Sequence, residues 1–250
     1  MSASPLVRVL PTPQELFQAA AEEVVRFAID AVRQRGRFSV ALSGGSTPRG
    51  LYTLLAATAR TAFPWTQTFF FWGDERHVPP DHPESNYRMV QEAMLSKVPV
   101  PTANIFRVPG EDDDAARAAE TYEQTLRKFF QLRPGEAPRF DLILLGLGPD
   151  GHTASLFPGT KGLEERFHLV IANWVEKFRT DRITFTLPVL NNASCVTFLV
   201  SGADKADVLR EVLEGKAPAE QYPAKLVQPT SGIVIWFLDR AAASALSTPR

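Results

Sequence analysis

The stretch Asp141-Leu-Ile-Leu-Leu-Gly-Leu-Gly-Pro-Asp-Gly-His-Thr-Ala-Ser-Leu-Phe-Pro158 decides how the rest of the sequence is interpreted. Its apolar run, Leu142 to Leu145, is typical of a strand that is buried on both faces of a parallel sheet. Three glycines then allow a tight turn, which would put Asp150 and His152 just past the carboxyl end of that strand. Open α/β sheets bind their ligands at this edge.

A carboxylate and an imidazole two residues apart are suited to acid–base chemistry. The alternative is that Asp150 only caps a helix and His152 is an ordinary loop residue, and the three residues Asp-Gly-His alone favour that alternative. The stretch Gly146 to Gly151 also fits the dinucleotide pattern G-x-G-x-x-G. Pro158 follows too soon for a long helix, however, and no acidic residue ends a second strand at the usual distance, so we do not expect a dinucleotide site.

Length and composition favour one α/β domain over residues 1–250 rather than two small ones. Apolar residues make up 44% and charged residues 22% of the chain, as in ordinary globular proteins. The formal charge of −1 gives no overall attraction to nucleic acid or to an anionic membrane. Cys195 is the only cysteine, which excludes an intrachain disulfide and a Cys-rich zinc site. Met1 to Leu10 has no signal-peptide core, so a cytoplasmic location is expected.

Strand and helix signals alternate along the chain, which predicts a mostly parallel sheet with helices on both faces. One helix has a full set of end signals: Thr12 as N-cap, Pro13 at the first position, Glu15 completing a capping box, and Gly36 at the end. The other expected helices cover residues 49–59, 86–95, 111–132, 205–213 and 241–246. The expected strands cover residues 7–10, 38–42, 68–72, 142–145, 169–172, 182–187, 195–200 and 232–238.

A second glycine loop, Ser43-Gly-Gly-Ser-Thr-Pro48, joins a predicted strand to a predicted helix. Free N–H groups and the helix dipole favour an anion such as phosphate in this arrangement. Thr47 is the expected N-cap and Pro48 the first helical residue, and no Gly-Lys-Ser/Thr of a nucleotide P-loop follows. A plain polar turn fits the segment equally well. The candidate phosphate donors are the amides and hydroxyls of Ser43, Gly44, Gly45, Ser46 and Thr47.

A third polar loop, Gly73-Asp-Glu-Arg-His-Val-Pro79, follows another buried strand and holds more charge than a turn requires. A metal site could be imagined from the carboxylates and imidazoles of Asp74, His77, Asp81 and His82. The prolines between them imply an extended path that spreads these side chains apart. We therefore expect no metal.

Taken together, these loops resemble the 6-phosphogluconolactonases. The resemblance runs from about Leu16 to Leu246 and rests on the motifs 43–48, 73–79, 84–87, 146–158, 182–190 and 202–206. It implies a Rossmann-like α/β fold and a hydrolase of the oxidative pentose phosphate pathway. The implied enzyme needs no cofactor and no metal, and opens a phosphorylated sugar lactone. The segment 175–181 departs from the family pattern, since it lacks the prolines expected beside Lys177.

Lactone opening requires an activated water and a stabilised oxyanion. Under the resemblance, His152 is the general base, with Asp150 or Asp74 orienting either the base or the water. Arg76 is the candidate for stabilising charge at the carbonyl, although it could instead pair with Glu75 or Glu84. The substrate phosphate would lie on the 43–47 loop with Arg182 and Lys205, unless the lysine is merely solvated.

Two other functions are compatible with the same loops. The related glucosamine-6-phosphate deaminases share the fold and the Asp-Gly-His turn, and a non-catalytic sugar-phosphate sensor could keep the loops without turnover. In the deaminase pattern an acidic residue stands five positions after the histidine, where this chain has Phe157. A phenyl ring cannot transfer protons, so the sequence favours the lactonase. It makes no prediction of oligomeric state.

Overall fold

The computed structural model describes residues 5–247 and is built on a six-stranded parallel sheet with the strand order β1-β9-β8-β5-β2-β3. Every neighbouring pair in this sheet is parallel. In the segment Met1 to Leu10, for which the sequence predicts no signal peptide, the first four residues lie outside the described range. The strands are β1 (Leu6–Leu10), β2 (Phe38–Leu42), β3 (Thr68–Trp72), β5 (Leu142–Leu145), β8 (Cys195–Val200) and β9 (Ile233–Asp239).

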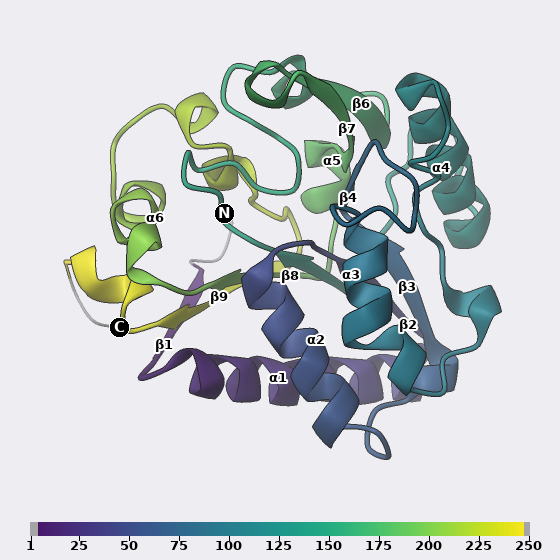
Figure 1. Cartoon of the computed structure of the whole chain (residues 1–250), viewed down its shortest axis with the longest axis horizontal. Helices are drawn as coiled ribbons and strands as arrows, with labels where there is room; N and C mark the ends of the chain where they lie inside the picture. Colours follow the sequence, from purple (N-terminus) through teal and green to yellow (C-terminus); the bar gives the residue numbers. More distant parts are fainter. Residues whose placement is uncertain (1–4, 248–250) are drawn as a thin grey trace.

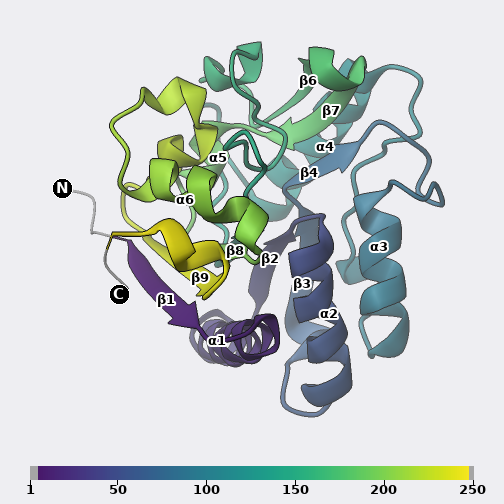
Figure 2. The same ribbon diagram turned by 60° about the vertical axis from the view of Figure 1, so that its left-hand side comes forward.

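Helices cover both faces of the large sheet, which confirms the predicted α/β class (Figure 1). On one face lie α1 (Pro13–Arg35), α2 (Ser46–Thr58) and α3 (Asn86–Ala93), which pack in that order, α1 on α2 and α2 on α3 (Figure 2). On the other side lie α4 (Ala115–Phe130), the single turn α5 (Leu187–Leu190) and α6 (Ala206–Leu213). Within the described range, no helix is both long and apolar enough to span a membrane.

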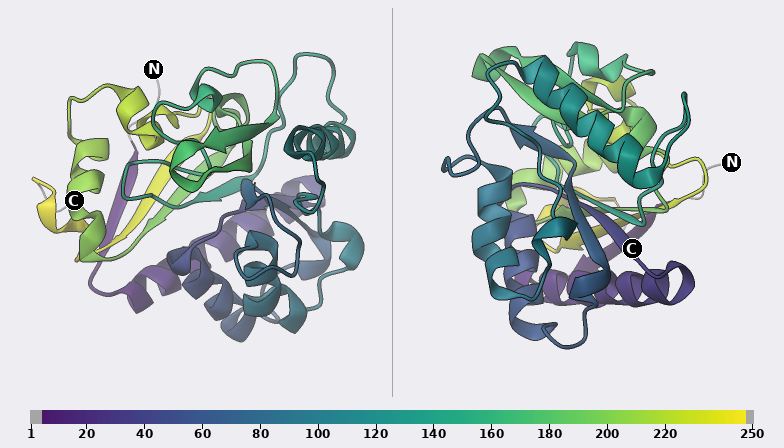
Figure 3. Two further views of the ribbon diagram at one scale, coloured as in Figure 1. Left: turned by 45° about the horizontal axis from the view of Figure 1, so that its top comes forward. Right: turned by 90° about the vertical axis from the view of Figure 1, so that its right-hand side faces the viewer.

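A second, three-stranded antiparallel sheet lies above the first and was not predicted (Figure 3). Its order is β4-β7-β6, with β4 (Asp74–Arg76), β7 (Thr180–Phe185) and β6 (Val170–Val175). The sequence prediction treated residues 74–76 as a loop, because a three-residue charged strand has no apolar periodicity. It predicted strands at 169–172 and 182–187 without assigning their partners, because periodicity does not reveal a strand's partner, and both strands belong to this second sheet.

The backbone of Gly73 connects the two sheets. Its N–H donates to the carbonyl of Leu42 at the end of β2 (2.9 Å), and its carbonyl accepts from the N–H of Phe185 at the end of β7 (2.8 Å). The chain therefore passes from β3 in the large sheet directly into β4 in the small one. This crossing brings the charged residues of β4 over the carboxyl ends of the parallel strands.

Two buried tyrosines hold the carboxyl ends of β2 and β3. The Tyr52 hydroxyl bonds to both the N–H and the carbonyl of Ser43 (3.0 Å each). The Tyr122 hydroxyl bonds in the same way to the N–H (2.8 Å) and carbonyl (3.1 Å) of Trp72. Burial raises the pKa of both phenols, so they remain neutral and able to donate. The strand ends next to the polar loops are thus satisfied without water.

The boundaries of α1 follow the predicted end signals, and the start of α2 does not. Thr12 caps α1 by accepting from the N–H of Glu15, and Gly36 ends that helix. We expected Thr47 to cap α2, but the helix begins at Ser46, and the first turn closes from the N–H of Arg49 to the carbonyl of Gly45 (3.1 Å). Pro48 is tolerated in this turn because its missing N–H would have no helical partner there.

Three other helices are shorter than expected. The predicted helix 86–95 ends at Ala93, and Leu95–Lys97 forms a 3-10 turn instead. The predicted helix 111–132 begins only at Ala115, because Asp114 accepts from the N–H groups of Ala116 and Arg117 and so acts as the N-cap. The expected closing helix at 241–246 is a 3-10 turn, Ala242–Ala245.

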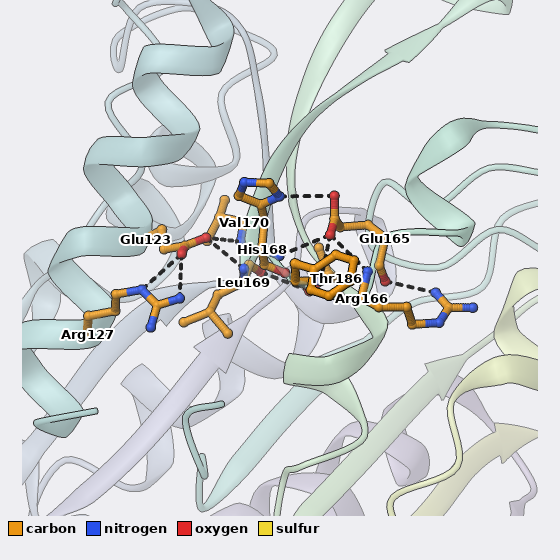
Figure 4. Close-up of polar contacts among 9 residues, drawn as sticks. Glu123, Arg127, Glu165, Arg166, His168, Leu169, Val170 and Thr186 are labelled. Atoms are coloured by element: carbon orange, nitrogen blue, oxygen red, sulfur yellow. Dashed lines mark hydrogen bonds and ion pairs between the residues drawn. The ribbon is translucent and has the colours of Figure 1, made fainter. Parts of the chain in front are cut away.

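Glu123 on α4 ties this helix to the start of β6 (Figure 4). One carboxylate oxygen accepts from the backbone N–H groups of Leu169 (2.7 Å) and Val170 (3.2 Å). The other oxygen pairs with Arg127 (2.8 Å). The Glu123 side chain is only 12% exposed, so removing it would leave two backbone donors of an edge strand without partners.

We expect Glu123→Ala to lower the free energy of unfolding by about 2 kcal/mol, since buried donors left unpaired cost about 1–3 kcal/mol. The midpoint of thermal unfolding should fall by several degrees, at roughly 2–4 °C per kcal/mol for a chain of this size. Glu120→Ala is the matched control, because Glu120 is exposed on the same helix. Equal midpoints for the two variants would contradict the assigned role of Glu123.

Candidate functional site

A pocket of about 290 Å³ lies between the carboxyl edge of the large sheet and the small sheet. This size is at the low end for small-molecule sites. Every residue that the sequence placed in the site lines this pocket except Asp150, which lies behind His152. The lining includes Ser43, Gly44, Gly45, Ser46, Thr47, Asp74, Arg76, His152, Arg182 and Lys205.

His152 is held in the pocket from three sides. Its Nδ1 forms a short contact with the carboxylate of Asp150, and its ring stacks on Phe157 with centroids 4.0 Å apart. A Cβ at position 148 would lie 2.0 Å from the ring, so only glycine allows the imidazole this place. If Nδ1 carries the proton toward Asp150, then Nε2 presents a lone pair that can accept one.

The ionisation of Asp150 fits this arrangement. Burial alone would raise its pKa, but the hydrogen bonds and charge of His152 outweigh burial and lower the pKa from an ordinary 3.8 to about 2. Lys177 adds a more distant cation, with Nζ 3.9 Å from the other carboxylate oxygen. Asp150 therefore carries its charge at neutral pH and does not cap a helix, since a bend follows it.

Asp74 lies on β4 in a different setting from Asp150. Its side chain accepts from the hydroxyl of Ser155 (2.7 Å), and the residue is only 8% exposed. No hydrogen bond joins it to His152 among the described residues. The geometry thus separates the two carboxylates that sequence reasoning left as alternatives: Asp150 contacts the imidazole, and Asp74 contacts the turn that follows it.

The glycine loop after β2 presents a donor without a partner. The N–H and carbonyl of Ser43 are both taken by Tyr52, while its Oγ is buried and bonds to no described residue. A buried hydroxyl with no partner is costly, and a ligand in the pocket would satisfy it. The N-terminus of α2 opens beside this serine, which adds unpaired N–H groups and the positive end of a helix dipole.

Two arginines face each other across the small sheet. Arg76 on β4 pairs in register with Arg182 on β7. Burial and the charge of Arg76 lower the pKa of Arg182. Arg76 donates to the carbonyl of Glu84 (2.6 Å), and neither arginine forms an ion pair within the described range. The proposed pairing of Arg76 with the carboxylates of Glu75 or Glu84 is therefore wrong. Like charges directly opposed on a sheet are destabilising, and an anion between them would offset the repulsion.

Lys205 completes the positive lining from the far side of the pocket. It stands at the start of α6, after β8, and its side chain is 21% exposed. Among residues 5–247 its ion-pair partner is the neighbouring Asp204, at 3.4 Å. Asp204 is itself 73% exposed, so this pair is weak.

Sequence reasoning missed several residues that line the pocket, including Asn86, Ser155, Phe178 and Ser201. Asn86 donates to the backbone carbonyl of Asp74 (2.9 Å). Its position had a signal, because Glu84-Ser-Asn-Tyr87 was among the motifs that carried the resemblance. Phe178 had none, since a phenylalanine in an irregular segment has no pattern to distinguish it.

The imagined metal site at residues 74–82 does not assemble. His77 Nε2 contacts the carbonyl of Asp112 (2.5 Å), whereas His82 Nδ1 accepts from the N–H of Glu84 (3.2 Å). In the part of the chain that the structure describes, no three His, Cys, Asp or Glu side chains gather as a metal would require.

The fold and the pocket define a class: an α/β protein with a pocket at the carboxyl edge of a parallel sheet, lined by cationic side chains and an imidazole. Comparison with known proteins then identifies the family. Residues 11–236 match the family described as glucosamine-6-phosphate isomerases/6-phosphogluconolactonase. The chain belongs to this family, as its motifs predicted.

Individual relatives match over nearly their whole length. A 6-phosphogluconolactonase from Synechocystis sp. is 46% identical over 97% of this chain and 99% of its own. One from Nostoc sp. is 44% identical over 96% and 98%. Among solved structures, 6-phosphogluconolactonase from Trypanosoma brucei has a TM-score of 0.88 at 31% identity and covers 98% of this chain and 100% of its own.

The contact of Asp150 with His152 predicts a pH-dependent stability. The folded pKa, about 2, lies below the ordinary 3.8, so the stabilisation is fully present above about pH 4 and is lost as pH falls through 2. We expect the difference in melting midpoint between the wild type and Asp150→Asn to be smaller at pH 3 than at pH 5. The exposed Asp113, changed to Asn, is the control. A difference that does not change down to pH 3 would contradict the prediction.

Proposed function

We propose that this chain hydrolyses 6-phospho-D-glucono-1,5-lactone to 6-phosphogluconate, a step of the oxidative pentose phosphate pathway. The observation that carries the proposal is the pairing of Asp150 with His152 beside a pocket lined by three cations, two of which, Arg76 and Arg182, form no ion pair among the described residues. The curated relatives that match over nearly the full chain are 6-phosphogluconolactonases, which supports the same activity here. No cofactor or metal is required by the reaction as proposed.

In this proposal His152 is the general base. The Asp150 carboxylate accepts a hydrogen bond from the protonated Nδ1, which leaves Nε2 unprotonated. Nε2 then removes a proton from water as the water oxygen attacks the lactone carbonyl. The tetrahedral intermediate then collapses, the bond between the carbonyl carbon and the ring oxygen breaks, and His152 returns the proton to that oxygen as a hydroxyl. Asp150 stabilises the transient imidazolium. Asp74 acts on the site through Ser155 and positions the turn that follows the histidine.

The cationic side chains contact the two ends of the substrate, its carbonyl and its phosphate. Arg76 stabilises the carbonyl oxygen as it becomes negative. The phosphate, with a charge of roughly −1.5 to −2 by analogy with phosphorylated side chains, lies on the 43–47 loop with Arg182 and Lys205. The unpartnered hydroxyl of Ser43 and the α2 N-terminus supply uncharged donors there.

Phe157 favours the lactonase over the deaminase. Its ring lies against the imidazole of His152, where an additional acid–base group would be needed to move protons between neighbouring carbons of an amino sugar. The pocket draws residues from both sheets, and we propose on that ground that the chain acts as one domain.

The test is a direct assay of the purified protein. We expect it to open 6-phosphogluconolactone faster than the spontaneous reaction and to release no ammonia from glucosamine 6-phosphate.

His152→Gln should reduce kcat by about 10²- to 10⁴-fold while binding of 6-phosphogluconate, measured by calorimetry, stays nearly unchanged. Stoichiometric ammonia would show a deaminase instead, and binding without turnover would show a sensor.

A second test concerns the phosphate end of the pocket. Lys205→Ala should raise KM for the phosphorylated lactone about tenfold or more, because it removes a charge-assisted contact worth about 1.5–3 kcal/mol. The unphosphorylated glucono-lactone should be opened with little change. Lys216→Ala, at an exposed position outside the pocket lining, serves as the control. Equal losses on both lactones would contradict the assignment of Lys205 to the phosphate.

A further inference from the structure

Phe178 is an apolar residue placed over a polar pocket. It lies at the tip of the hairpin between β6 and β7 and lines the same pocket as His152 and the glycine loops. Its residue surface is 45% exposed, although large apolar side chains are ordinarily buried. The site as described so far gives this ring no role.

The ring is held in place by its neighbours. Its edge meets Phe157 with centroids 5.8 Å apart at 75°, and the guanidinium of Arg182 lies 5.1 Å from its centroid. Arg179, the next residue, has a left-handed backbone with φ of 49°, which ends the turn after Phe178. A residue other than glycine adopts this conformation only at a cost, so the surrounding hairpin must impose the turn.

The position of Phe178 along the pocket follows from these contacts. On one side, Phe157 connects it to the imidazole of His152, where the reacting carbonyl must lie. On the other side it contacts Arg182, which belongs to the anion end. A substrate with its carbonyl at His152 and its phosphate near Arg182 therefore has its ring beside Phe178.

We propose that Phe178 is a specificity-determining residue that packs on the C–H face of the closed lactone ring. A six-membered sugar lactone is polar around its rim and presents C–H groups on its faces, which pack on an aromatic plane. The open-chain product has no such face. Phe178 thereby favours the closed substrate over the open-chain product, an inference that rests on the proposed function.

The experiment compares three ligands on Phe178→Ala. We expect KM to rise on the order of tenfold for both 6-phosphogluconolactone and unphosphorylated glucono-lactone, with kcat less affected. The dissociation constant of 6-phosphogluconate, measured by calorimetry, should change less than twofold. Phe178→Tyr, which keeps the planar ring, should restore KM. Phe167→Ala is the matched control, because Phe167 is 88% exposed and lies outside the pocket lining.

Two results would overturn the proposal. One is an unchanged KM for both lactones in Phe178→Ala while the wild type remains active, which leaves the lactonase function intact. The other is an equal loss of affinity for lactones and product, which would show a general disturbance of the pocket instead of ring recognition. A wild type without lactonase activity would reject the proposed function itself, and the role of Phe178 with it.

Discussion

The geometry of the site depends on the backbone of Gly73, which is hydrogen-bonded to both sheets. Its N–H bonds to the end of β2 and its carbonyl to the end of β7, so the small sheet cannot shift without breaking a bond to the large one. This junction sets the height of β4 above the parallel strands. Asp74 and Arg76, which are two residues apart and therefore share a face, both point into the pocket as a result.

The residue between them, Glu75, points to the opposite face and fixes the loop that follows. Burial raises the pKa of this carboxyl, and three backbone N–H groups oppose the shift by donating to it. Two of these donors are the N–H groups of Asn86 and Tyr87, at 2.7 and 2.8 Å. As the first amides of α3 they have no acceptor within the helix. A buried acid placed at a helix N-terminus thus positions Asn86 against the pocket.

The pocket combines features that would be unfavourable in an empty site. The two arginines opposed across β4 and β7, and the buried Ser43 hydroxyl without a partner, each cost stability that an anionic ligand would recover. Behind the pocket, the charge of Asp150 is paired with His152 and orients its ring. The stability of the fold therefore comes from the apolar strands and the tyrosine-capped strand ends, and the cations are left available for binding.

The sequence by itself determined the parallel sheet, because its buried strands are continuous apolar runs and its helices carry their own end signals, as Thr12 and Gly36 do for α1. It also determined the polar loops at the carboxyl edge, since glycine and charge after a buried strand are local patterns. Only the tertiary structure decided which carboxylate contacts His152, that Arg76 opposes Arg182, and that Phe178 reaches the pocket. The last two facts depend on the pairing of β4, β7 and β6, and strand pairing joins distant residues, which local periodicity does not encode.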